Sequence, residues 1–207
     1  MRYASEGASR RFIESIDEYT ASVVQEAEDR AQSYIRSIDE YFHVRRKTVG
    51  VKPSLALFQF GLNLPDDVLE DPIIERLTNA CIDMIILDND LYSYNVEQAR
   101  GDAGHNIITI VMHQKKIGLS EAVNWIGDHH SKLGQQFLND LKHVPHFDKM
   151  IELDVKHYLD GLGNWVRANE CWSFESHRYF GMSGREVQQS RKVVLLPRSA
   201  QICSTKI

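Results

Sequence analysis

The sequence is poor in cysteine, proline and long apolar runs. Its 207 residues include five prolines and three cysteines, Cys81, Cys171 and Cys203. An odd number of widely separated cysteines favours neither a disulfide framework nor a clustered zinc site. No apolar run reaches the roughly 18 residues that span a bilayer, and the N-terminus "MRYASEGASRR" lacks the apolar core of a secretory signal. We therefore expect a cytoplasmic protein without a membrane span.

An excess of positive charge is missing as well. Lys and Arg number 24 against 29 Asp and Glu, which gives a formal net charge of -5. Proteins that bind nucleic acid usually present a basic surface, so nucleic acid is not expected as a partner. The content of 43% hydrophobic and 26% charged residues is ordinary for a globular domain.

Helical patterns follow one another along the chain. Residues 9–45 have neither Gly nor Pro and predict one long helix or two abutting ones. A short helix is predicted for "PSLALFQFGL", a loop for "NLPDDVLEDP" and a long helix for residues 73–98. Two more long helices are predicted, one from Leu119 with Ser120 as its N-cap and one from Phe147. "RKVVLLP" indicates an extended tail packed across the bundle, so the fold class expected is all-α, a helical bundle.

The segment "ILDNDLYSYNVEQARGDAGHN", residues 86–106, carries three polar side chains four residues apart. At about 100° per residue, Asn89, Ser93 and Glu97 share one face of a helix over two turns. An amide oxygen, a hydroxyl and a carboxylate are hard ligands, which suit Mg²⁺ better than zinc or copper. Since Mg²⁺ keeps several waters and is often completed by substrate phosphates, the pattern predicts one wall of a diphosphate site.

Two other interpretations of this segment deserve weight. An exposed helix face is the commoner arrangement for such residue types. A calcium loop beginning at Asp88 would need Gly at its sixth position and Glu at its twelfth, where this chain has Ser93 and Ala99. The calcium loop is therefore excluded, and the interpretation of the triad as an exposed helix face stays an alternative.

Asp128, His129 and His130 suggest a metal-dependent phosphohydrolase at first sight. Adjacent residues on a helix point about 100° apart, however, and cannot easily share a metal ion. A solvated helix face is the expectation here. "HVPH" at residues 143–146 lacks further ligands nearby and is expected to be a loop.

Three motifs resemble one protein family. "NDLYSYNVEQARGDAGHNIITIVM" is similar to the metal-binding segment N-D-x-x-S-x-x-x-E of class I terpene synthases, and its continuation resembles fungal, particularly basidiomycete, sesquiterpene synthases. "YFHVRRKTVGVKP" resembles the helix break whose arginine senses the diphosphate, and "HRYFG" resembles the arginine-tyrosine pair that grips it. The motifs stand in the family's order, and the resemblance covers nearly the whole chain. It implies the class I terpenoid synthase bundle.

The resemblance implies a role for each matching residue. The triad Asn89, Ser93 and Glu97 would hold Mg²⁺. Arg45 would sense the diphosphate, with Arg46 as the alternative, because the spacing leaves the choice open. Arg178 and Tyr179 would donate hydrogen bonds to diphosphate oxygens, and arginine suits bidentate phosphate contacts. No catalytic residue is predicted beyond these contacts with metal and substrate.

The resemblance also implies a substrate, farnesyl diphosphate, whose carbocation cyclises in a dry pocket lined by aromatic rings. Phe58, Phe60 and Trp165 are candidates for the pocket wall, since ring faces stabilise positive charge. Aromatic residues on an apolar helix face more often serve core packing, so these three are the weakest assignment.

The chain departs from the family at two places. Val96 stands where many members have Lys, which removes an auxiliary diphosphate contact. The aspartate-rich motif that binds two further Mg²⁺ ions is missing, and "PDDVLED", with its carboxylates in a loop, is not expected to replace it. We expect an N-terminally truncated fold, with residues 1–180 forming a partial terpene synthase domain and residues 181–207 a C-terminal tail.

Two functions follow from these observations. The first is a Mg²⁺-dependent sesquiterpene cyclase that converts farnesyl diphosphate to a cyclic sesquiterpene and releases diphosphate. The alternative is a catalytically inactive helical protein that binds diphosphate weakly, or binds a protein partner. Apolar helix faces left uncovered by the missing segment are expected to drive oligomerisation or aggregation.

Overall fold

The computed structural model describes residues 4–32 and 34–198. All of its regular elements in these ranges are helices, so the predicted all-α bundle is confirmed. The longer helices are α1 (Glu6–Ala31), α2 (Ile38–Thr48), α3 (Val51–Phe58), α5 (Pro72–Arg100), α6 (Ile107–Lys115), α7 (Leu119–Asp140) and α8 (Glu152–Glu175). The shorter elements are α4 (Asp66–Leu69), α9 (Gly184–Ser190) and the 3-10 turns η1 (Ala103–His105), η2 (Leu141–His143) and η3 (Gly181–Ser183).

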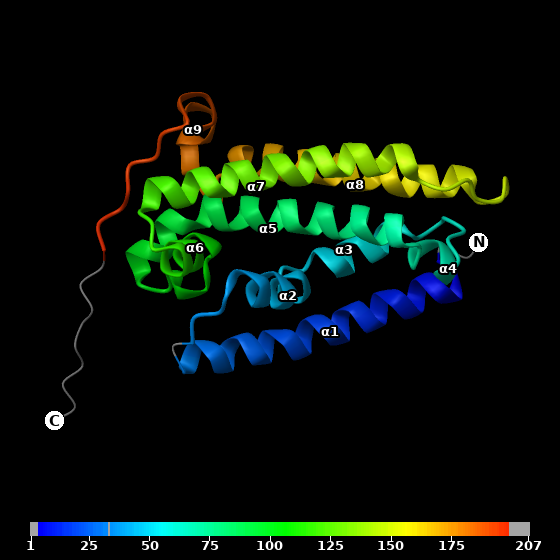
Figure 1. Ribbon diagram of the computed structural model, residues 1–207, viewed down its shortest axis with the longest axis horizontal. Coiled ribbons are helices and arrows are strands. Elements are labelled where there is room, and N and C mark those ends of the chain that lie inside the picture. Colours follow the sequence, from blue (N-terminus) through cyan, green and yellow to red (C-terminus); the bar gives the residue numbers. More distant parts are fainter. Residues whose placement is uncertain (1–3, 33, 199–207) are drawn as a thin grey trace.

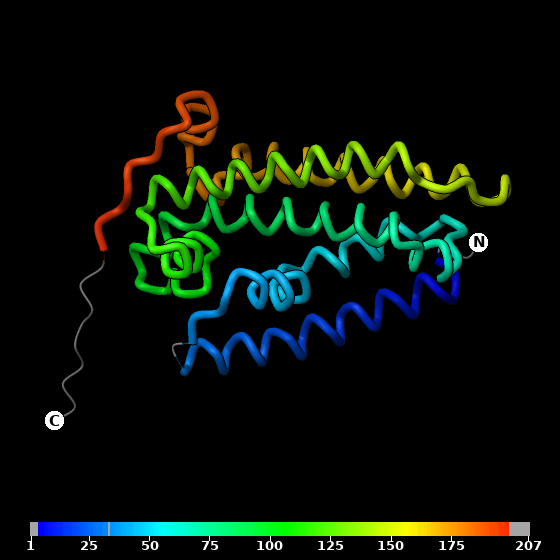
Figure 2. Tube along the Cα trace, in the orientation of Figure 1, coloured from blue at the N-terminus to red at the C-terminus, as the bar shows by residue number. Residues whose placement is uncertain are grey.

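Helix α5 lies at the centre of the bundle. In Figure 1 it runs between α7 and α8 on one side and α1, α2 and α3 on the other, and the tube in Figure 2 shows the same two layers around it. Residues 80–88 are all buried, and apart from Asp83 and Asp88 they are apolar, as expected of a helix that other helices surround. The polar triad therefore belongs to the central helix and follows directly on its most buried stretch.

The limits of α5 have clear local causes. Asp71 is its N-cap, and Asp71 Oδ1 accepts hydrogen bonds from the backbone N–H of Ile73 at 2.8 Å and Ile74 at 3.3 Å. Pro72 occupies the first helical position, where its missing N–H costs nothing. Gly101 ends the helix with φ of 84°, a left-handed conformation that glycine adopts without a Cβ penalty. The prediction of a helix over residues 73–98 is confirmed.

One helix start differs from the expectation, and another decides between two alternatives that the sequence left open. The predicted N-cap Ser120 is wrong: Gly118 caps α7, and its N–H donates to Glu121 Oε2 at 2.9 Å. Glu121 satisfies this donor from the third helical position, so the helix begins two residues earlier than a serine cap would allow. Residues 9–45 form two helices because Ser37 and Glu40 make a reciprocal capping box at the start of α2. The predicted loop after α3 contains the one-turn helix α4.

Residues 191–198 form an extended segment that contacts α5. Asn95 donates to Val194 O at 3.1 Å and accepts from the Leu196 N–H at 2.8 Å, while Gln98 donates to Leu196 O at 2.9 Å. Val194 is 91% exposed, so α5 holds the backbone of this segment and leaves this side chain in solvent. Residues 199–207, with Cys203, lie outside the described residues.

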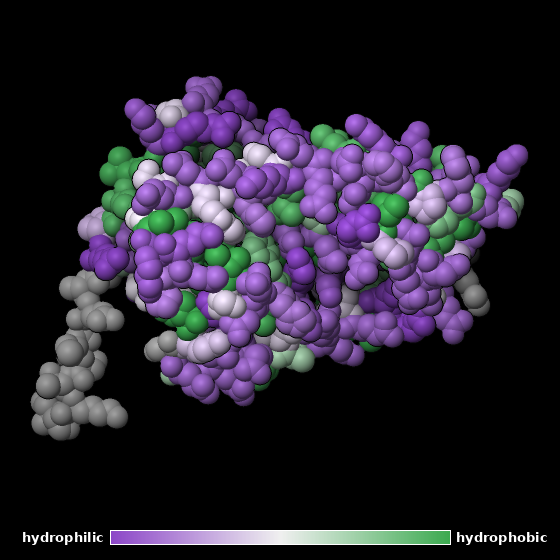
Figure 3. Space-filling model, in the orientation of Figure 1, coloured by the Kyte–Doolittle hydropathy of each residue, from purple (hydrophilic) through white to green (hydrophobic). Residues whose placement is uncertain are grey.

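The surface is largely polar. Figure 3 shows polar side chains over most of the face presented, with apolar ones in small groups. Ile13 and Val24 on α1 are 59% and 60% exposed, and oligomerisation through such residues stays a prediction. In the part of the chain that the structure describes, no helix is both long and apolar enough to cross a membrane.

A buried polar cluster joins α5 to α7 and α8 on the side away from α1. Asp88 Oδ1 lies 3.5 Å from His130 Nε2 and from the Tyr92 hydroxyl. His129 stacks on Trp125 with ring centroids 4.8 Å apart. The expected solvated face at the two histidines is therefore wrong: both are half-buried, because this face of α7 packs against the other helices.

Burial raises the pKa of Asp88 to about 7, and the nearby charge of Glu170 adds to this effect. His130 does not compensate, because burial lowers its own pKa and favours the neutral ring. Between about pH 4 and pH 7 the folded protein thus binds a proton at Asp88 that the unfolded chain has released.

Because the folded state binds the extra proton, the free energy of unfolding should fall as the pH rises through this range. Asp88→Asn removes the ionisable group and should stabilise the protein at pH 8 by up to about 4 kcal/mol, with little effect at pH 4. Urea unfolding at both pH values measures the difference. Asp128→Asn on the exposed side of α7 is the control, and an equal response of the two variants would contradict the assignment.

The end of α5 offers a second test. Gly101→Ala places a Cβ in the left-handed region and should lower the free energy of unfolding by about 1 kcal/mol, although no other atom lies within 4 Å of that Cβ. Gly127→Ala, in the middle of α7 with equally open surroundings, should instead raise it by about 0.5 to 1 kcal/mol. Thermal unfolding compares the two. Equal destabilisation by both variants would contradict the left-handed conformation of Gly101 as the cause.

Candidate metal and diphosphate site

The triad lies in the C-terminal half of α5, and its three residues are half-buried. The interpretation of Asn89, Ser93 and Glu97 as a fully exposed helix face is therefore wrong. Their common face is turned toward other parts of the protein, where polar side chains need partners. The partners of Asn89 and Glu97 come from α2, from the segment after α8 and from the start of α6.

Asn89 connects two of the predicted diphosphate contacts. Arg45 donates from a guanidinium nitrogen to Asn89 Oδ1 at 2.7 Å, and Asn89 Nδ2 donates to the Tyr179 hydroxyl oxygen at 2.8 Å. A guanidinium has donors alone, so the amide atom that faces it must be the oxygen. Because the Tyr179 oxygen accepts from the amide, its own proton is free to be donated elsewhere.

Arg45 and Arg46 point to different parts of α5. Arg46 makes two parallel hydrogen bonds of 2.7 Å to the carboxylate of Asp83, which lies six residues before Asn89. Arg45 reaches Asn89 itself. The geometry thus brings Arg45 to the triad and occupies Arg46 in a structural ion pair.

Arg45 stays positively charged although most of its side chain is buried and only 20% of it is exposed. Burial opposes the charge, yet the neighbouring Tyr41 and Asp90 raise the pKa of Arg45 above its usual value. Asp90 Oδ1 lies 3.6 Å from the guanidinium, and Asp90 Oδ2 accepts a hydrogen bond of 2.5 Å from the Tyr41 hydroxyl. A fixed cation is therefore available beside the triad.

Three residues near the site were not foreseen from the sequence: Tyr41, Asp90 and Asn106. Asn106 donates to Glu97 Oε2 at 3.0 Å, while Tyr41 and Asp90 form the network beneath Arg45. The position of Asn106 directly before the apolar run "IITIVM" is a recognisable N-cap signal for α6. Asp90 is the second residue of the motif N-D-x-x-S-x-x-x-E, but no role was predicted for it, and no local pattern marks Tyr41.

Arg178 occupies a different position from its neighbour Tyr179. It is exposed, and its guanidinium carbon lies 5.8 Å from the ring centroid of Trp172 and 5.5 Å from that of Tyr179. This stacking keeps the charge near the site without a hydrogen bond to the triad. The diphosphate role of Arg178 stays a prediction.

The predicted pocket-wall aromatics divide into two groups. Phe58 and Trp165 contact each other edge to face, with ring centroids 5.1 Å apart, between α3 and α8. Phe60 instead contacts Phe12 of α1 at 6.1 Å and is 37% exposed. The structure brings the first two together and places Phe60 elsewhere.

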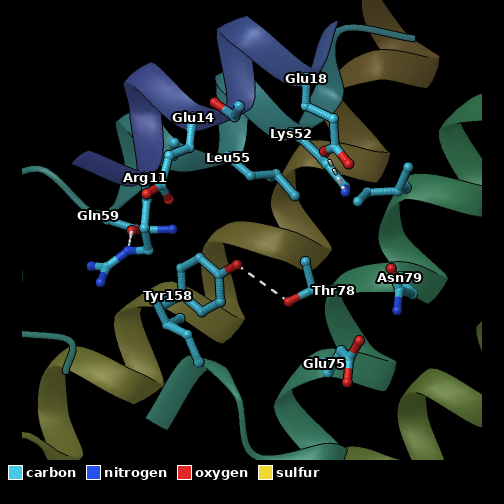
Figure 4. A pocket seen from close by; sticks show the side chains of 14 residues that line it. Arg11, Glu14, Glu18, Lys52, Leu55, Gln59, Glu75, Thr78, Asn79 and Tyr158 are labelled. Carbon is cyan, nitrogen blue, oxygen red and sulfur yellow. Dashed lines mark hydrogen bonds and ion pairs between the residues drawn. The ribbon is translucent and has the colours of Figure 1, made fainter. Parts of the chain in front are cut away.

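A cavity of about 540 Å³ lies between α1, α3, α5 and α8. Figure 4 shows that its lining is rich in polar groups, among them the Glu18–Lys52 ion pair of 2.8 Å and the contact of 3.2 Å between the Thr78 and Tyr158 hydroxyls. Ile82, also in the lining, precedes Asn89 by seven residues and so lies two turns away on the same face of α5. The triad and the predicted aromatics are outside this lining, so the cavity adjoins the triad's face of α5 without containing the triad.

The ligand chemistry of the triad restricts the kind of ion that fits. Within the described residues no group of three His, Cys, Asp or Glu side chains could hold a metal. The triad offers one carboxylate, one amide oxygen and one hydroxyl, which fits a hard cation that retains water and takes further oxygens from a phosphate. In "PDDVLED", Asp66 pairs with Arg10 and Arg11 and Asp71 caps α5, so these two carboxylates are already engaged.

The chain resembles known proteins in sequence and in fold. Residues 1–136 match the family model described as terpene synthase family 2, C-terminal metal binding. The chain is 54% identical over 190 residues to a Delta(6)-protoilludene synthase of Hypholoma sublateritium, covering 92% of this chain and 58% of that protein. It is 50% identical over 195 residues to a Delta(6)-protoilludene synthase of Armillaria gallica, covering 94% and 56%. The chain therefore spans a little more than half the length of these relatives.

A solved structure supports the fold. The linalool/nerolidol synthase of Streptomyces clavuligerus, in complex with 2-fluorogeranyl diphosphate, has a TM-score of 0.74 at 20% identity, covering 82% of this chain and 60% of that one. At this identity the likeness concerns the fold alone. Together with the family model, which matches more than half of the sequence, these findings show that the chain belongs to the terpene synthase family and contains its C-terminal metal-binding region.

Proposed function

We propose that this chain provides the Mg²⁺ and diphosphate-binding wall of a sesquiterpene cyclase, which converts farnesyl diphosphate to a cyclic sesquiterpene and releases diphosphate. The observation that supports it most strongly is the hydrogen-bonded connection of Asn89 to Arg45 and Tyr179. Three residues that the motifs assign to metal and diphosphate, far apart in sequence, meet at one point. The relatives named as protoilludene synthases support a fifteen-carbon substrate.

In this proposal the side chains prepare a place for the leaving diphosphate. Asn89 Oδ1, the Ser93 hydroxyl and the Glu97 carboxylate would hold Mg²⁺, which when bound would neutralise the negative charge that develops on the diphosphate. Arg45 is paired with Asp90 beside the triad before the substrate arrives, and it would stabilise that charge once its guanidinium turned to the diphosphate. The Tyr179 proton, which the hydrogen bond from Asn89 leaves free, is donated to a diphosphate oxygen.

Arg45 and Mg²⁺ both need Asn89 Oδ1. The guanidinium occupies this oxygen at 2.7 Å in the structure, and two cations so close together repel each other. Asn89 Oδ1 would therefore be open to Mg²⁺ once the Arg45 guanidinium turned from the amide toward an anionic diphosphate. The binding of metal and the binding of diphosphate would then be coupled through the Asn89 side chain.

The metal assignment predicts a specific loss in Glu97→Gln. The change removes the single carboxylate of the triad and should weaken Mn²⁺ binding in the presence of inorganic diphosphate by roughly 10- to 100-fold, measured by electron paramagnetic resonance. Glu70→Gln is the matched control, since Glu70 is exposed at the C-cap of α4, and α4 lies at the opposite end of the bundle from α6 (Figure 1). Equal Mn²⁺ affinity in both variants would contradict the triad as a metal site.

The activity is tested by product analysis. Farnesyl diphosphate and Mg²⁺ are incubated with the 207-residue chain, and in parallel with a chimera that joins it to the N-terminal segment of the Hypholoma relative. The chimera should release diphosphate and yield a cyclic hydrocarbon detected by gas chromatography. The chain by itself should yield none above background, because the second metal-binding wall is missing. A cooperatively folded chimera without product would favour the catalytically inactive alternative.

A further inference from the structure

Asn106 is one of the most deeply buried polar side chains described in this protein, with 2% exposure. It precedes α6, and Asn106 Oδ1 accepts a hydrogen bond from the Ile108 N–H at 2.9 Å, as an N-cap does. Capping by this oxygen leaves the two N–H donors of the amide for other partners. Both N–H donors make hydrogen bonds to acceptors on α5.

The amide nitrogen of Asn106 binds two parts of the triad helix. It donates to the carbonyl oxygen of Asp90 at 2.8 Å and to Glu97 Oε2 at 3.0 Å. A second hydrogen bond joins the same two segments, because the Asp90 carboxylate accepts from the Ile107 N–H at 2.7 Å. The start of α6 is therefore fastened to α5 at residue 90, and Asn106 extends from this fixed point to the carboxylate at residue 97.

A fixed donor matters for a glutamate that has to bind a metal. The half-buried Glu97 side chain has three rotatable bonds, and a metal site is weakened when its ligand must be ordered at the moment of binding. One hydrogen bond to Oε2 restricts these rotations and leaves Oε1 and the remaining Oε2 lone pair open to an ion. Since an amide is neutral, it orients the carboxylate without compensating its charge, unlike the lysine or arginine of an ion pair.

We propose that Asn106 is a positioning residue, which orients the Glu97 carboxylate for a divalent cation and connects that orientation to the turn between α5 and α6. The inference rests on the proposed metal site and adds to it a residue outside the triad. Outer partners of metal ligands typically change metal affinity by roughly 10- to 100-fold when they are removed. The same is expected of Asn106.

Asn106→Ser separates the two roles of the side chain. Serine is an equally good N-cap, so α6 keeps its start. It lacks the amide nitrogen, so the hydrogen bonds to Glu97 Oε2 and to the Asp90 carbonyl oxygen are both lost. Asp71→Ser is the matched control, because it makes the same kind of change at the N-cap of α5, 26 residues before Glu97 along the chain.

The experiment uses the whole 207-residue chain with Mn²⁺ and inorganic diphosphate as probes. The melting temperature is measured with and without both probes, and the Mn²⁺ dissociation constant by electron paramagnetic resonance. Asn106→Ser should melt below the wild type without the probes, because the buried Asp90 carbonyl loses its donor. It should also lose most of the increment that the probes give and bind Mn²⁺ roughly 10- to 100-fold more weakly. Asp71→Ser should keep the full increment even where its melting temperature is lower.

Each other outcome counts against a different statement. If Asn106→Ser lowers the melting temperature but keeps the wild-type increment and Mn²⁺ affinity, the residue is structural and the inference is wrong while the metal site stands. If the wild type itself gains no increment and binds no Mn²⁺, the proposed metal site fails, and the positioning role fails with it.

Discussion

The amide of Asn89 is the point on which the geometry of the site depends. It accepts a hydrogen bond from Arg45 of α2 and donates one to Tyr179 beyond α8. One side chain of the central helix therefore determines where the Arg45 guanidinium and the Tyr179 phenol lie. An amide can do this because it combines an acceptor and donors about 2 Å apart. An aspartate at this position would accept from both neighbours and leave no donor to direct the Tyr179 proton outward.

Beneath this contact, a buried network holds the helices in register. Asp90 accepts from the Tyr41 hydroxyl and the Ile107 N–H, which fixes α2 and the start of α6 to α5. A buried carboxylate is costly unless donors surround it, so the network is stable as a whole and sensitive to the loss of any member. The position of Arg45 is therefore set by the packing of three helices.

Local signals in the sequence sufficed for the helical elements and for part of the site. Pro72 and Gly101 mark the ends of α5, and the four-residue spacing of the triad follows from the helical period. The choice between Arg45 and Arg46 could not be made, because adjacent residues on a helix differ by about 100° and the direction of α5 relative to α2 is a tertiary property. Asn106 was missed as a partner of Glu97 for the same reason: its cap is a local feature, but the return of α6 onto α5 is not.

The charges near the triad explain why a metal would be needed at all. Arg45 is the cation placed at Asn89, and Asp90 at 3.6 Å already offsets much of its charge, while Glu97 adds another negative group. A diphosphate carries several negative charges and would meet a site that is close to neutral or negative. A divalent cation resolves this conflict, because it is attracted by Glu97 and in turn attracts the phosphate oxygens. By itself Glu97 would repel a diphosphate, but with a divalent cation bound to it, the same carboxylate would help to hold that diphosphate.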